Sequence, residues 1–202
     1  MLDSVGVADP IQEVGKKKEM KNLYKPYLKD AFRIGVFSGL RTAEVAHLKW
    51  SNVKWSDKMN GYLLEVENRK VVKFKKTMKQ KSKKPRMKII PIGIDLMEVL
   101  VEMGFDEMIG QDVYVIDSDR KVKPQTVTDA ISKGFSHYYR QCFPDRALLQ
   151  FKHLRKVYLS YLRKTAGGDT HKFSDHSDED ILDKNYIDPE IAVMVSKMRV
   201  FG

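Results

Sequence analysis

Apolar residues recur along the chain at two spacings, one typical of helices and the other of strands. From Tyr27 to Val36 they recur at helical spacing and stop at Ser38-Gly39, which predicts a buried helix that ends at a glycine. A second helix is predicted from Thr42 to about Lys49. Clusters of aliphatic and β-branched residues between polar turns predict strands over Asn52–Trp55, Gly61–Val66 and Met87–Ile92.

The second half of the chain is predicted to be largely helical. A helix with apolar residues from Leu96 to Met103 is followed by a short strand over Val113–Ile116. Further helices are predicted around Val127–Tyr139, Phe151–Arg163, Asp178–Tyr186 and Pro189–Met198. The whole pattern predicts an α+β fold that is mostly helical and contains one small sheet.

Residues 1–21 show no sustained periodicity. Gly6, Pro10 and Gly15 interrupt the segment, and Lys16-Lys17-Lys18 adds a run of charge, so we expect a linker or arm here. The packed domain is expected to span residues 22–202. A chain of 202 residues with 42% hydrophobic content suffices for one sizeable core.

The chain is basic, with 37 Lys and Arg residues against 27 Asp and Glu residues and a net charge of +10. A surplus of this size attracts polyanions such as nucleic acid. A basic surface without such a partner would have the same composition. The charge therefore admits a nucleic-acid partner without requiring one.

Cysteine content and hydropathy narrow the class of protein. Cys142 is the only cysteine, which excludes an internal disulfide and a multi-cysteine zinc site. No apolar stretch of about 18 residues occurs and no signal-peptide pattern is found, so we expect a cytoplasmic protein with no membrane partner. The acidic run over residues 175–183 is the best alternative as a metal site, but its spacing is more typical of a solvated helix. We expect no metal and no other cofactor.

The densest pattern of functional residue types lies between Phe37 and Trp50. A Gly39-Leu40-Arg41 turn opens the predicted helix, Glu44 follows, and Leu48-Lys49-Trp50 ends the segment. Arg41 either points into a site from this turn or pairs with Glu44 to fix the start of the helix. The segment resembles the first arginine motif of the tyrosine recombinases (integrase family), in which Gly-Leu-Arg is followed by Glu and Leu-x-Trp.

Two later segments resemble the family's other motifs in the expected order. In Lys152-His153-Leu154-Arg155, Arg155 matches the second catalytic arginine. Lys152 occupies the slot usually held by histidine, as in some archaeal-virus integrases, and His153 lies one residue out of register, about 100° away around a helix. Phe173-Ser174-Asp175-His176-Ser177 resembles the Leu-Gly-His-Ser box, with an aspartate in place of glycine, and Tyr186 matches the nucleophile. The resemblance covers about residues 25–190.

The chemistry of a phosphodiester fits these residue types. Two guanidiniums, from Arg41 and Arg155, can hold the non-bridging oxygens bidentately and stay charged at any working pH. The phenol of Tyr186 can form a phosphotyrosyl ester, which stores the energy of the broken bond so that no ATP is needed. His176 and Lys152 could bond the phosphate or carry the tyrosine proton.

The leaving 5′ oxygen needs a proton donor, which in the resembled family is a lysine on the turn between the second and third strands. The choice stays open here. Counting forward from Arg41 favours Lys70, counting back from Ile90 points to Lys83, and Lys76 precedes a threonine as in the family's Lys-Thr pair. Each of these lysines could instead contact backbone phosphates only.

The resemblance implies a recombinase catalytic-domain fold with a three-stranded antiparallel sheet. It further implies site-specific cleavage and rejoining of double-stranded DNA attachment sites, by a tetramer encoded by a virus or mobile element. Only about 20 residues precede the first predicted helix, so we expect the upstream core-binding domain to be absent from this chain. The segment from Pro189 to Val200 would either dock on a neighbouring subunit or pack on its own domain.

Two other functions share these residues. A type IB topoisomerase-like enzyme would use the same covalent chemistry to relax DNA. A DNA-binding module that has lost catalysis stays open while Lys152 occupies the histidine slot.

Overall fold

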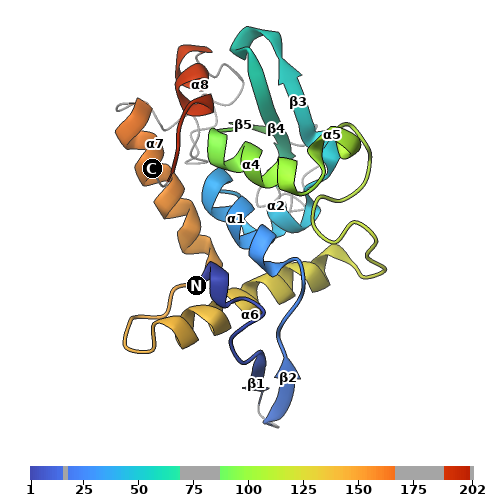
Figure 1. Cartoon of the computed structure of the whole chain (residues 1–202), viewed down its shortest axis with the longest axis vertical. Coiled ribbons are helices and arrows are strands. Elements are labelled where there is room, and N and C mark those ends of the chain that lie inside the picture. Colours follow the sequence, from blue (N-terminus) through green and yellow to red (C-terminus); the bar gives the residue numbers. More distant parts are fainter. Residues whose placement is uncertain (16–17, 69–86, 167–188, 201–202) are drawn as a thin grey trace, which may run out of the picture.

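The computed structural model describes residues 1–15, 18–68, 87–166 and 189–200. About half of these residues are helical, and the strands form two small antiparallel sheets (Figure 1). The α-helices are α1 (Leu28–Ser38), α2 (Thr42–His47), α4 (Ile94–Glu102), α5 (Phe105–Met108), α6 (Pro124–Cys142), α7 (Leu154–Ala166) and α8 (Pro189–Ser196). The strands are β1 (Ile11–Val14), β2 (Glu19–Asn22), β3 (Val53–Ser56), β4 (Gly61–Glu67) and β5 (Met87–Pro91). Short 3-10 helices are η1 (Leu2–Ser4), η2 (Trp50–Asn52), η3 (Asp57–Met59) and η4 (Phe151–His153).

Helix α1 is the centre of the packing. It contacts α2, α4, α6 and α7, and Figure 1 shows α4 and α6 on opposite sides of it. Phe32 of α1 meets Phe135 of α6 edge to face, with ring centroids 5.3 Å apart, and Phe151 lies 5.8 Å from Phe135. Edge-to-face pairs of this kind add to the stabilisation that burial alone gives.

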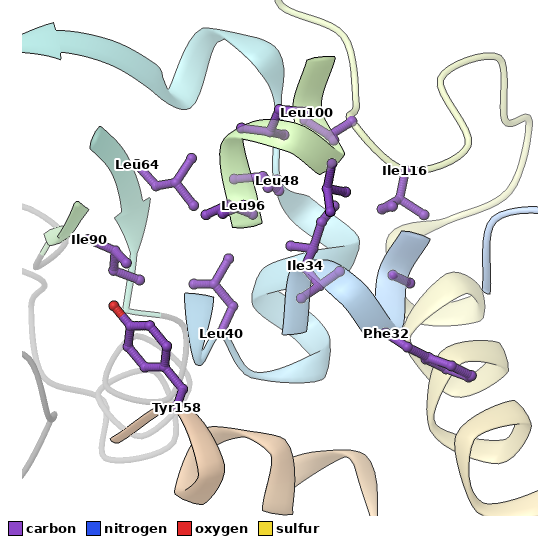
Figure 2. Close-up of a cluster of buried hydrophobic side chains, with 14 of the residues drawn as sticks. Phe32, Ile34, Leu40, Leu48, Leu64, Ile90, Leu96, Leu100, Ile116 and Tyr158 are labelled. Carbon is purple, nitrogen blue, oxygen red and sulfur yellow. The ribbon is translucent and has the colours of Figure 1, made fainter. Parts of the chain in front are cut away.

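The three-stranded sheet covers another side of the core. Its order is β3-β4-β5, and Leu64 pairs with Ile90 in the register of β4 and β5. Figure 2 shows both side chains turned toward Leu40 and Leu96, so one face of the sheet packs on α4 and the end of α1. The predicted α+β class and the small antiparallel sheet of three strands are therefore confirmed.

The structure corrects one predicted element and adds another. Val113–Ile116 is not a strand: a single bridge joins Tyr114 to Lys49, and the flanking bonds run from Trp50 N–H to Val113 and from Val115 N–H to Leu48. Its aliphatic residues are buried because the loop lies on the core, not because it belongs to a sheet. The short helix α5 was not predicted. The helix predicted over Asp178–Tyr186 falls outside the described residues.

The segment predicted to be a linker or arm contains secondary structure. η1 packs against the core through Met1 and Leu2, and β1 and β2 then form a hairpin that projects from the body in Figure 1. The base of the hairpin is fixed to α6, because the carbonyl of Asp9 contacts His137 Nε2 at 2.7 Å and accepts a bond from Gln141 at 2.7 Å.

The last described helix packs on its own domain. Val195 of α8, with Met198 and Val200 after it, belongs to the hydrophobic core. Arg199 bonds Glu98 on α4 at 2.7 Å. Within this chain, the segment therefore adopts the second of the two predicted arrangements.

Close approach at a helical glycine makes a test of this packing. A Cβ added at Gly35 of α1 would lie 2.3 Å from Phe151 Cζ, inside the aromatic cluster. We expect Gly35→Ala to lower the free energy of unfolding by about 2 kcal/mol, the usual cost of overpacking, despite the better helix propensity of alanine. Urea unfolding measures the change.

Gly61→Ala is the matched control. Its added Cβ would lie 3.6 Å from the nearest atom, which is an ordinary contact, so a change within about 0.5 kcal/mol is expected. A Gly35→Ala protein as stable as the wild type would show that Phe151 does not hold this position.

Candidate active site

The predicted arginine turn lies between α1 and α2. Gly39 ends α1 with a left-handed φ of 63°, which only glycine adopts without strain. Arg41 then precedes α2 in an extended conformation, and its backbone N–H donates to Glu44 Oε2 at 2.9 Å. Glu44 is thus the residue that satisfies the chain at the start of this helix.

Glu44 also gathers two cations. Its Oε1 accepts from Arg41 Nη1 at 3.1 Å and from Lys88 Nζ at 2.6 Å. The Glu44 side chain is completely buried, that of Lys88 is 10% exposed and that of Arg41 is 29% exposed. A buried carboxylate needs such partners, because an unpaired charge in the interior costs several kcal/mol. Arg41 is therefore the member of this cluster that reaches the surface.

Lys88 is a site residue that the sequence pattern did not identify. It lies on β5 two residues before buried Ile90, so both side chains occupy the core face of the sheet. Strand alternation from Ile90 was the signal that could have found it. The signal is weak because Ile89 is also aliphatic, and the pattern alone does not say which of the two faces the core.

Arg155 comes to the same turn from the other end of the sequence. Its Nη1 donates to the carbonyl oxygen of Gly39 at 2.7 Å, although 116 residues separate the two. The contact depends on close packing of α7 on α1: a Cβ on Gly39 would lie 2.5 Å from Tyr158. The structure therefore brings Arg155 to the turn that carries Arg41, as the motif spacing predicts.

Lys152 and His153 differ in their surroundings. Lys152 is exposed on η4, three residues before Arg155. His153 is partly buried, and its Nδ1 accepts the backbone N–H of Gln150 at 2.9 Å. The His153 ring therefore stabilises the start of η4, and Lys152 is the side chain that is accessible to a ligand.

A tyrosine near Arg155 does not have the properties of a nucleophile. Tyr158 lies one helical turn further along α7 and is 3% exposed. Burial raises the pKa of its phenol well above the ordinary value, an effect that nearby Arg155 only partly offsets. Figure 2 shows the ring directed toward Leu40 and Ile90 in the core.

The other predicted site residues lie outside the described residues: Lys70, Lys76, Lys83, His176 and Tyr186. Within the part of the chain that the structure describes, no three His, Cys, Asp or Glu side chains are grouped as metal ligands would be. None of the helices described has the length and apolar character needed to span a bilayer. Comparison with protein-family models, with curated proteins and with solved structures finds no match for the chain.

The different roles of Lys152 and His153 can be tested through stability. His153→Ala removes the acceptor of the Gln150 N–H, so we expect the free energy of unfolding to fall by about 1 kcal/mol, as for other caps. Lys152→Ala, at an exposed neighbouring position, should change it by less than about 0.5 kcal/mol. Urea titrations of the two variants measure both values, and equal stabilities would contradict the capping role.

Proposed function

We propose that the chain is the catalytic domain of a tyrosine recombinase, which cuts and rejoins DNA through a covalent bond between Tyr186 and a phosphate. The observation that carries the proposal is the 2.7 Å bond from Arg155 to Gly39, which gathers two distant arginines at one turn. An arginine that only fixed a helix start would need no second arginine beside it. The proposed fold is the family's catalytic-domain fold.

Arg41 and Arg155 would act on the charge that develops during the reaction. Attack on a phosphodiester adds negative charge to the non-bridging oxygens, and preorganised guanidiniums stabilise that charge without further reorganisation. Arg41 suits this role because Glu44 fixes its backbone and one of its guanidinium nitrogens, while part of the side chain stays exposed. Such fixing reduces the entropy lost when the phosphate binds.

Tyr186 would supply the nucleophilic oxygen and form a 3′-phosphotyrosine, releasing a 5′ hydroxyl. Lys152 and His176 would bond the phosphate or accept the tyrosine proton. Lys70, Lys83 or Lys76 would donate a proton to the leaving oxygen. Rejoining reverses the step: the 5′ hydroxyl of a partner strand attacks the phosphotyrosine and frees Tyr186.

The partner would be double-stranded DNA carrying attachment sites, bound by a tetramer of the protein. The net charge of +10 supports binding to the phosphate backbone. A mobile genetic element or virus acting in a host cytoplasm would encode such an enzyme.

A nicked suicide DNA substrate tests the proposal, because loss of the short cleaved strand traps the covalent intermediate. We expect the wild type to form an adduct that survives denaturing electrophoresis, and Tyr186→Phe to form none. Arg41→Lys and Arg155→Lys should slow adduct formation roughly 100-fold, since lysine cannot clamp two oxygens. Tyr24→Phe, at a partly exposed tyrosine of the arm, is the control and should react as the wild type does.

The outcomes separate the related functions. An adduct together with relaxation of supercoiled plasmid, but no strand exchange between two attachment sites, would favour a topoisomerase-like enzyme. DNA binding without any adduct would favour a module that binds DNA and has lost catalysis. An adduct that persists in Tyr186→Phe would contradict the assignment of the nucleophile.

A further inference from the structure

The geometry points to Lys88 as a positioning residue: by balancing the charge of Glu44, it leaves Arg41 free to act as a cation toward the scissile phosphate. This inference rests on the proposed function. It concerns a residue of β5 that would act through Glu44 and would not itself touch the DNA. The proposal starts from the shared carboxylate oxygen, Glu44 Oε1, on which both cations converge.

The distances make Lys88 the closer of the two partners. Its Nζ lies 2.6 Å from Glu44 Oε1, whereas Arg41 Nη1 lies 3.1 Å from the same oxygen. Lys88 is also the more buried cation, at 10% exposure against 29% for Arg41. Coulomb attraction is strongest at short range and away from water, so the carboxylate charge is compensated first by Lys88.

The charges of the three side chains then decide what a phosphate meets. Two cations against one carboxylate leave one positive charge, and it resides on Arg41 because that side chain reaches the surface. Without Lys88, Arg41 and Glu44 would form a neutral pair, and the buried carboxylate would lie behind the guanidinium and repel an approaching phosphate. Lys88 therefore keeps the turn cationic where the reaction needs it.

A role as the general acid fits Lys88 less well. Transfer of its proton to a leaving oxygen would remove the positive charge that compensates a completely buried carboxylate. Loss of that compensation costs free energy at the moment of reaction. A positioning role keeps the proton on Lys88 throughout the cycle.

The main experiment compares Lys88→Met with the wild type on two suicide substrates in single-turnover cleavage. On the ordinary phosphodiester we expect the rate to fall roughly 10- to 100-fold, as when other residues that orient a functional group are removed. On a methylphosphonate at the scissile position, where one charged oxygen is replaced by a neutral methyl group, the loss should shrink to about threefold or less. Equal losses on the two substrates would mean a purely structural role and would overturn the proposal.

Two variants serve as matched controls. Lys88→Arg keeps the positive charge and should retain most of the rate. Glu44→Gln combined with Lys88→Met removes both buried charges and keeps the one positive charge of Arg41, so it should cleave faster than Lys88→Met alone. If Lys88→Met does not fold, as thermal unfolding will reveal, the double variant decides: a rate within about tenfold of the wild type supports the proposal, and a greater loss overturns it.

A third substrate separates positioning from proton donation. A 5′-bridging phosphorothiolate has a sulfur leaving group, which departs as a thiolate and needs no proton. Lys88→Met should stay slow on this substrate, and recovery of the wild-type rate would make Lys88 the general acid. If the wild type forms no adduct on any substrate, the proposed function itself fails; if it does and Lys88→Met matches it, only the role of Lys88 fails.

Discussion

The close approach of η4 and α7 to α1 is the constraint on which the rest of the site depends. Gly35 leaves the space that the Phe151 ring fills, and Gly39 leaves the space for Tyr158. With side chains at these positions, α7 would move outward and Arg155 would lose the Gly39 carbonyl. The aromatic core and the pairing of the two arginines are therefore consequences of one packing contact.

A second constraint is the burial of Glu44. A carboxylate with no solvent contact must be surrounded by donors, and the chain supplies them from three places: the backbone N–H of Arg41, its guanidinium and the ammonium of Lys88. Such a cluster contributes little net stability, because desolvation offsets the Coulomb attraction. Its physical effect is to fix where the charges lie.

The sequence predicted the elements whose periodicity is long and clear, among them α1, α6 and the three-stranded sheet. It also predicted that Arg41 and Arg155 belong together, because the motifs around them are specific. It failed at Val113–Ile116, where burial comes from a loop on the core, and at Lys88, whose burial depends on a carboxylate from another element. Both failures involve partners distant in the sequence, which a local pattern does not contain.

Gly39 joins these two constraints at one residue. Its left-handed φ turns the chain from α1 toward α2, its missing side chain admits Tyr158, and its carbonyl accepts from Arg155. The Gly-Leu-Arg pattern is therefore a packing requirement as much as a chemical one, since the glycine sets the approach of α7 that brings the second arginine. A substitution at Gly39 would disturb the position of Arg155 through α7 before it altered Arg41, although Arg41 is the nearer residue in the chain.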